Sequence, residues 1–169
     1  SLISLGYAIP GAVVGLGIII LFTSINYYFD SVYLIGTLFT LIYALVIRFL
    51  AVGKSPIKSS LEKHPKSYDE TGKILGLYSL GLFRKVFFPI NISAMIIAFI
   101  ITFVDLMKEL PITLILRPFN FDTLATQTYE FAIEEMLVKS SIYSLVIILI
   151  GASMLIILKK FIYKYNYVS

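Results

Sequence analysis

The sequence predicts an all-α membrane protein with four transmembrane helices. Hydrophobic residues make up 59% of the 169 residues and the mean hydropathy is +0.92, which is too apolar for a soluble domain. Charged residues are only 14%, and they cluster between long uncharged runs. Each run approaches the ~20 residues that a helix needs to cross about 30 Å of hydrocarbon. The predicted spans are 9–26, 32–51, 87–107 and 141–159.

The first two spans contain glycine, proline and arginine residues that indicate how their helices pack and where they end. Gly11 and Gly15 form a small-xxx-small pattern, which either lets a neighbouring helix approach closely or reflects the ordinary glycine content of membrane helices. Arg48 interrupts the second apolar run, and we expect its side chain to snorkel toward the interface. The Gly53-Lys54-Ser55-Pro56 sequence predicts a break in the helix shortly afterwards.

The third span ends in a charged sequence. Asp105 follows Phe87 by 18 residues, about 27 Å along a helix, which predicts that it lies near the far edge of the membrane. An ion pair with Lys108 on the same helix is available. Two interpretations stay open: interfacial structure, or a polar pathway lined by Asp105 and Glu109.

The outer segment, 108–140, predicts a surface helix. Residues 112–116 are too few to span a membrane, so they either re-enter it or pack on the bundle; residues 117–121 form a turn. Asp122 can cap an amphipathic helix with Glu130 and Glu134 on its polar face. The predicted apolar face holds Ala125, Tyr129, Ala132 and Met136.

The acids of that helix are either a solvated face or a docking surface for a partner outside the cell. The candidates for outer-face contacts are Lys108, Arg117, Asp122 and Glu130.

Orientation follows from the distribution of charge. Residues 48–85 hold eight Lys or Arg against three acids, and the tail adds three lysines, whereas 105–141 is net negative. Because Lys and Arg favour the cytoplasmic side, the 52–86 loop and the C-terminus are predicted to be cytoplasmic.

The cytoplasmic loop contains an ordered polar stretch, 67–90. Ser67 and Glu70 have the spacing of a capping box, and Gly76 offers a turn six residues later. Pro89 fits the start of the third span, where a missing N–H costs nothing. The pattern predicts a helix, a turn and a second helix that enters the membrane.

Several kinds of chemistry find no support in the sequence. His64 is the only histidine and there is no cysteine, so no catalytic triad or firm metal site is expected. No phosphate-binding glycine loop occurs, and the basic residues flank spans without interleaved aromatics. We therefore expect no enzyme activity, no cofactor and no nucleic-acid partner.

The polar stretch resembles the cytoplasmic loop of bacterial ABC-importer permeases, which contains Glu-Ala-Ala, three residues, glycine, nine residues and an Ile/Val-x-x-Pro ending. Thr71 and Gly72 replace the two alanines, and the glycine costs about 1 kcal/mol of helix propensity. The matching positions are Glu70, Thr71, Gly72, Gly76, Val86 and Pro89.

A more specific resemblance is to the ferric-iron permeases of this family. It rests on 105–119, 121–126 and Tyr129-Glu130, with further similarity at 6–11 and 47–53. The resemblance implies a MetI-like bundle in a bacterial inner membrane, with this chain as the C-terminal part of a longer permease. It covers nearly the whole chain.

The resemblance also implies partners. Two ATP-binding subunits would bind the cytoplasmic loop, and a periplasmic binding protein would deliver ferric iron. The other permease half and membrane lipid would surround the spans. Val86 and Pro89 would link the loop to the third span. The residues that would contact the ATP-binding subunits are Tyr68, Asp69, Glu70, Thr71, Gly72, Gly76 and Leu77.

Two alternatives stay open. The same type of permease could carry thiamine, a polyamine, sulfate or a phosphonate. The charged residues do not decide between these cargoes, because Asp105 and Glu109 suit a cation whereas Lys108 and Arg117 suit an anion. A self-sufficient channel or secondary transporter should show polar or broken helices at the midplane, of which these spans show little.

Overall fold

The computed structural model describes residues 9–28, 34–64, 72, 74 and 76–166. Within this part of the chain every regular element is helical. The elements are α2 (Gly11–Tyr28), α3 (Leu38–Lys63), α5 (Ser79–Leu82), the π-helical segment η1 (Phe83–Phe87), α6 (Phe88–Met107), α7 (Pro111–Leu116), α8 (Leu124–Ile133) and α9 (Leu137–Asn166).

Four helices are long and apolar enough to cross a membrane: Gly11–Tyr28, Leu38–Lys63, Leu80–Met107 and Leu137–Tyr163. This confirms the all-α fold with four transmembrane helices. Few of their residues are buried within the chain, and in the apolar window of α9 no residue is. Such helices are stable only when lipid or other apolar helices surround them.

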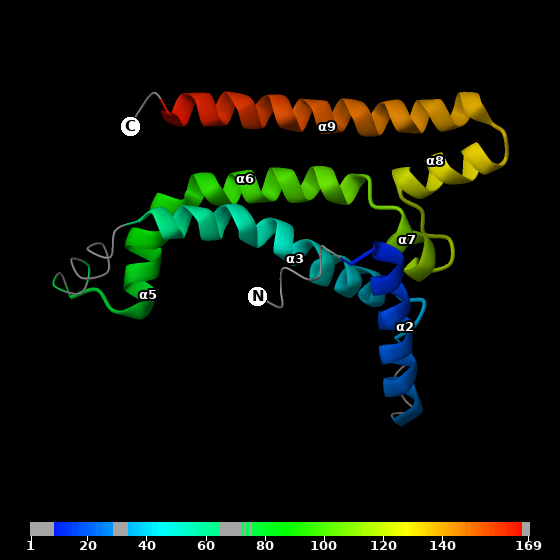
Figure 1. Ribbon diagram of the computed structural model, residues 1–169, viewed down its shortest axis with the longest axis horizontal. Helices are drawn as coiled ribbons and strands as arrows, with labels where there is room; N and C mark the ends of the chain where they lie inside the picture. The colour runs from blue at the N-terminus through cyan, green and yellow to red at the C-terminus, as the bar shows by residue number, and fades with distance from the viewer. Residues whose placement is uncertain (1–8, 29–33, 65–71, 73, 75, 167–169) are drawn as a thin grey trace.

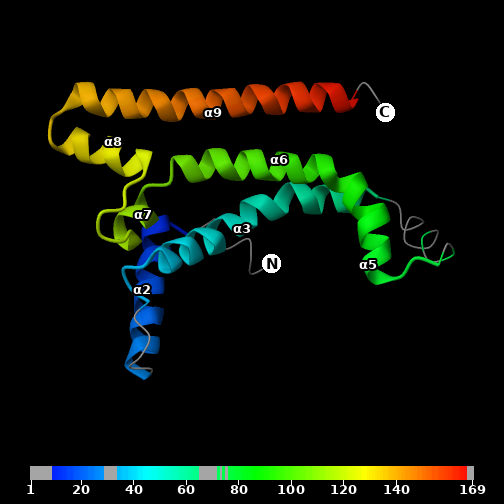
Figure 2. The same ribbon diagram turned by 180° about the vertical axis from the view of Figure 1, so that it is seen from behind.

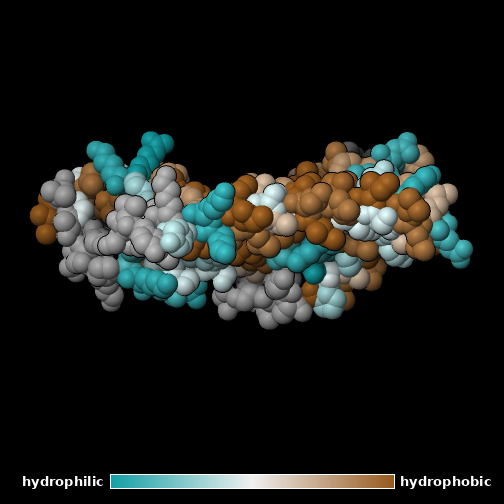
Figure 3. Space-filling model, turned by 90° about the horizontal axis from the view of Figure 1, so that it is seen from above, coloured by the Kyte–Doolittle hydropathy of each residue, from teal (hydrophilic) through white to brown (hydrophobic). Residues whose placement is uncertain are grey.

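Three of the four helices lie side by side. Figures 1 and 2 show α6 between α3 and α9, and both neighbours pack directly on it. Helix α2 points away from this layer, and it meets the other elements chiefly through α7 and α3. Figure 3 shows a broad hydrophobic surface along the molecule, with hydrophilic side chains gathered mostly near its ends.

The predicted helix break at Gly53-Lys54-Ser55-Pro56 is wrong. Helix α3 runs through Pro56 and ends at Lys63, with an extended His64 after it. A proline inside a helix loses one backbone hydrogen bond. Packing against α6 offsets this loss: a Cβ built on Gly53 would lie only 3.4 Å from Thr102 Oγ1.

The third predicted span is the end of a longer helical run. Helix α5, η1 and α6 follow one another without a gap from Ser79 to Met107, and Figure 1 shows α5 bent sharply away from α6. The Phe88 N–H bonds the Phe83 carbonyl, five residues back, as in a π-helix. Pro89 follows at once, and its missing N–H would leave a carbonyl unpaired in a regular helix. A π-turn and a proline together account for the bend.

The best-packed core lies where α2, α3 and α7 meet. Ile112 and Ala44 are completely buried there, and the short helix α7 packs on both neighbours. Of the two expectations for residues 112–116, the structure therefore supports packing on the bundle. The core residues are Ile18, Phe22, Leu41, Ala44, Ile112 and Leu116.

The outer helix is shorter than expected, and its cap differs. Thr123, not Asp122, is the N-cap of α8, and it forms a reciprocal capping box with Thr126. Residues 117–121 form the predicted turn, with Asn120 at φ 60°. Of the residues predicted for its apolar face, Ala125 is buried, Tyr129 and Ala132 are exposed within the chain, and Met136 lies beyond the end of α8.

Helix α8 instead turns back along α9. The Ser140 hydroxyl donates to the Thr128 carbonyl at 2.9 Å, and the Phe131 and Tyr143 rings lie 5.4 Å apart. These contacts make α8 and α9 a helical hairpin at the end of the molecule where α9 begins.

Candidate functional site

The predicted docking segment is described only in its second half. Tyr68, Asp69, Glu70 and Thr71 lie outside the described residues, as does the predicted capping box. Gly76 has φ +75° and the Leu77 N–H donates to the Gly72 carbonyl at 2.9 Å. A left-handed glycine with this bond one residue later is the Schellman ending of a helix. The predicted turn at Gly76 is therefore present.

Gly72 occupies a position where a side chain would collide. A Cβ there would overlap Leu82 Cδ1 and would lie 4.0 Å from Val86 Cγ2. Leu82 is buried on α5, and Val86 belongs to the π-turn that precedes Pro89. Glycine in place of the family's alanine thus brings the end of the docking segment against the bend leading into α6.

The most buried charges of the described chain belong to Arg48 and Glu109. Arg48 Nε lies 3.4 Å from Glu109 Oε2, and the two side chains are 16% and 8% exposed. Arg48 Nη1 also donates to the Ile9 carbonyl at 3.3 Å. The second Glu109 oxygen accepts the Ile112 N–H at 3.2 Å. One ion pair therefore connects α3, the start of α2 and the start of α7.

Gly11 makes this junction possible. A Cβ at Gly11 would lie 2.6 Å from Arg48 Nη1 and 2.8 Å from Glu109 Oε1, closer than real Cβ atoms approach polar atoms. Gly15 lies over Ile115 of α7, at 3.3 Å for its own hypothetical Cβ. The small-xxx-small pattern is a close-packing surface for the junction and α7.

The expectation that Arg48 snorkels is wrong, because its side chain turns inward to Glu109. The sequence held a partial signal: an arginine with apolar residues on both sides needs a partner when it is removed from water. The partner is 61 residues away in sequence, so no local pattern identifies it.

Asp105 and Lys108 form the predicted intrahelical pair. Lys108 Nζ lies 2.9 Å from Asp105 Oδ1, with the lysine 65% exposed and the aspartate 19% exposed. The two acids proposed for a pathway are therefore separated in role: Asp105 pairs with an exposed lysine, and Glu109 with a buried arginine. Among the residues that the structure describes, no three acidic or histidine side chains gather as metal ligands would.

A second charged cluster lies between α7 and α8, in the segment predicted to be outside the membrane. Arg117 follows α7 and pairs through its two terminal nitrogens with Asp122 and Glu130. All three side chains are partly exposed, at 24%, 38% and 36%. Asp122 thus fixes the turn before α8 rather than capping the helix, and Glu130 is an ion-pair partner rather than a solvated acid.

Comparison with known proteins bears on these sites. No protein-family model matches the chain. The chain is 28% identical over 158 residues to the Fe(3+)-transport system permease protein FbpB 2 of Haemophilus influenzae, a match that covers 94% of this chain. The resemblance to ferric-iron permeases is thereby confirmed. The chain spans 30% of the length of that relative.

Proposed function

We propose that this chain is part of the membrane permease subunit of an ATP-driven ABC importer, and that its cargo is ferric iron. The observation that carries the proposal is the similarity to an Fe(3+)-transport permease along 94% of the chain. Four helices suited to crossing a membrane agree with it. The chain would itself hydrolyse nothing, because ATP would be bound by separate subunits.

The coupling site would be the segment 68–77, with Val86 and Pro89 joining it to α6. The contact of Gly72 with Leu82 and Val86 supports this role, because a force on the segment would act directly on the bend. Rigid-body motion of packed helices is an established way to change access across a membrane. The positive-inside rule supports a cytoplasmic position for this segment and for the C-terminus.

At the outer end, a binding protein would meet the surface formed by the cluster of Arg117, Asp122 and Glu130. These side chains combine partial exposure with defined geometry, since Arg117 holds both acids in place. The remaining apolar surface of the four helices would contact lipid and the other permease half.

The coupling role is tested by Glu70→Ala in the whole permease, with Glu62→Ala as the matched control. Glu62 lies on the exposed end of α3, outside the segment. We expect Glu70→Ala to lower uptake and co-purification of the ATP-binding subunit, while the amount in the membrane stays unchanged. Equal uptake and equal co-purification in both variants would contradict the docking role.

The cargo is tested by uptake into cells or vesicles that contain the complete system. We expect ferric iron to be taken up, and thiamine, polyamines, sulfate and phosphonates not to compete with it. Competition by one of these solutes would contradict iron as the cargo while leaving the permease intact. Uptake that persists when the ATP-binding subunit is removed would contradict an ABC importer and favour an independent channel or transporter.

A further inference from the structure

Helix α6 packs against α9 in such a way that the C-terminal end of α6 lies beside the middle part of α9. A Cβ at Gly151 of α9 would lie 3.9 Å from Val104, so these two residues are level. The uncharged run of α9 is bounded by Lys139 and Lys159. Gly151 is about 18 Å from the first and about 12 Å from the second at the helical rise. If α9 crosses the membrane between its lysines, Val104 lies near the midplane.

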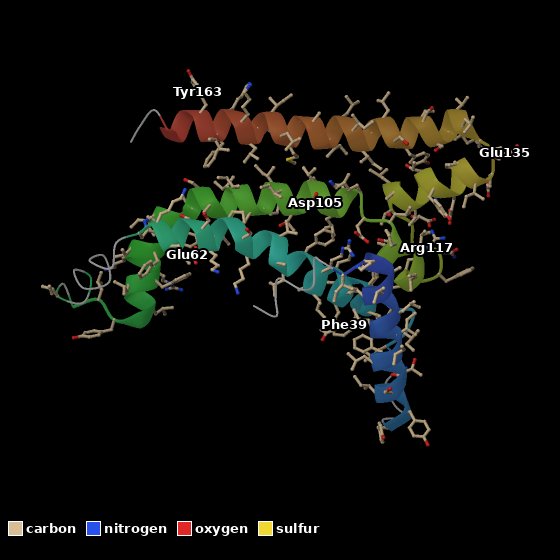
Figure 4. All side chains as sticks on the ribbon, viewed as in Figure 1. Phe39, Glu62, Asp105, Arg117, Glu135 and Tyr163 are labelled. Carbon is tan, nitrogen blue, oxygen red and sulfur yellow. The ribbon has the colours of Figure 1, made fainter. Side chains whose placement is uncertain are left out.

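Helix α3 gives the same result independently. Thr102 is level with Gly53, which lies about 22 Å along α3 from its beginning at Leu38. Figure 4 shows Asp105 beside the middle of α9, between Glu135 at one end and Tyr163 at the other. The sequence-based estimate put Asp105 at the far edge because it began the membrane at Phe87, whereas the register with α9 puts Lys159 level with about residue 96 of α6, nine residues later.

Helices α6 and α7 then make one discontinuous crossing. Helix α6 ends at Met107, and α7 starts at Pro111 on the outer side of that point. Ile112 and Thr113 of α7 are 0% and 2% exposed, so the short helix fills the space among its neighbours. Broken helices near the midplane are the elements from which transporters build their pathways.

The junction at the break is held by the Arg48–Glu109 pair. Glu109 contacts Arg48 of α3 and the Ile112 N–H of α7, while Arg48 also contacts the carbonyl before α2. Charges at such depth occur paired, and they mark functional positions.

We propose that Arg48 and Glu109 form a charge pair inside the membrane that holds α7 as a barrier across the outer half of the permease. Arg48, Glu109 and Gly11 are then positioning residues. When the ion pair between Arg48 and Glu109 separates, α7 moves from its packed position. This inference needs the helices to cross a membrane. It needs neither ferric iron as the cargo nor a docking role for residues 68–77.

The test uses cysteine accessibility in the whole permease with its partners, after replacement of any cysteine outside this chain, which itself contains none. Thr113→Cys reports on the buried face of α7, and Phe119→Cys, at a position that is 94% exposed, reports on the outer surface. A membrane-impermeant maleimide is added from outside. We expect Phe119→Cys to react and Thr113→Cys to be protected in the otherwise unchanged protein.

Opening the pair should remove this protection. With Glu109→Gln, labelling of Thr113→Cys should rise about tenfold or more, because a small change in the free energy of opening multiplies the open population. The double variant Arg48→Gln/Glu109→Gln removes both charges and should restore much of the protection. Lys58→Ala breaks the exposed pair with Glu62 on the same helix as Arg48 and should leave labelling unchanged.

Two outcomes would overturn the barrier role. Labelling of Thr113→Cys that is fast in every background would mean that α7 is not a barrier. Labelling that rises equally with Lys58→Ala would mean that the buried pair has no special part in holding α7.

Depth is tested separately with spin labels at Leu106 on α6 and at Leu149 and Val138 on α9. The register places Leu106 level with Leu149, and all three positions are at least 40% exposed in the chain. We expect oxygen and nickel-chelate accessibilities at Leu106 to match those at Leu149 and to differ from Val138 at the outer end. Accessibilities at Leu106 equal to those at Val138 would place the end of α6 at the interface and overturn the inference.

Discussion

The chain contains two arginine-centred charge clusters that differ in burial. Arg48 and Glu109 are 16% and 8% exposed and meet through a single 3.4 Å contact, supplemented by backbone hydrogen bonds. Arg117 at the outer end divides its guanidinium between two carboxylates, and all three side chains there are at least 24% exposed. The Arg117 cluster has more ion pairs. The Arg48–Glu109 pair, however, joins α3 to the starts of both α2 and α7.

Burial, rather than the number of contacts, decides which cluster matters for the fold. Water screens an exposed pair, so that removing one partner costs at most about 1 kcal/mol. Removing one partner of a buried pair leaves a charge without compensation, at a cost of about 3–5 kcal/mol. Removing only one member of the Arg48–Glu109 pair is therefore expected to be costly. Replacing both members with apolar residues of similar size need not destabilise the protein.

The largest effect is expected for Glu109→Ala. This change leaves Arg48 charged and buried and removes the acceptor of the Ile112 N–H, so unfolding should become easier by about 3–5 kcal/mol. Thermal unfolding of the purified whole permease in detergent measures it. Arg48→Met/Glu109→Leu should recover most of the loss, and a double variant as unstable as the single one would contradict an ion-pair mechanism.

Gly11→Ala comes next, because the added methyl group overlaps Arg48 Nη1 and Glu109 Oε1. Both atoms are the far ends of flexible side chains, so the ion pair rather than the backbone must shift, and the cost should lie near the lower end of the ~1–3 kcal/mol typical of overpacking. Gly17→Ala on the same helix is the control: a Cβ there has nothing within 4 Å, and alanine favours the helix by up to about 1 kcal/mol. Melting temperatures that fall alike for both variants would show that Gly11 is not specially placed.

Glu130→Gln should have a smaller effect on stability, of less than about 1 kcal/mol, since Arg117 keeps Asp122 as a partner and water reaches the site. The effect should shrink further when the salt concentration is raised. A loss as large as that of Glu109→Ala, measured in the same unfolding assay, would remove the distinction between the two clusters.

The smallest effect is expected for Lys58→Ala. Lys58 and Glu62 form an i,i+4 pair at 3.4 Å on α3, and both side chains are more than 60% exposed. Pairs of this kind contribute about 0.3–0.5 kcal/mol. A melting temperature that shifts by several degrees would indicate that this surface is covered in the assembled protein.

Local sequence patterns predicted the parts of the fold that depend on local physics. Uncharged runs located the four apolar helices because hydrocarbon tolerates little else. The glycine at position 76 marked a turn, and Asp105 and Lys108 paired because a helix brings residues three apart together.

The misses involve contacts between different structural elements, which no pattern within one helix predicts. Pro56 did not end α3 because α6 packs alongside it, and Asp122 did not cap α8 because Arg117 draws it away. Arg48 pairs with Glu109, which lies 61 residues later in the sequence. The depth of α6 was misjudged for a similar reason, since it depends on which residues of α3 and α9 lie beside it.

A double-mutant cycle tests the contrast between the two clusters most directly. Arg48 and Glu109 are replaced by glutamine singly and together, and Arg117 and Glu130 are replaced in the same way. Unfolding of the whole permease gives one coupling free energy for each pair. The expected values are about 2 kcal/mol or more for the buried pair and less than about 1 kcal/mol for the outer pair. Equal coupling in the two pairs would contradict a special role for Arg48 and Glu109 inside the membrane.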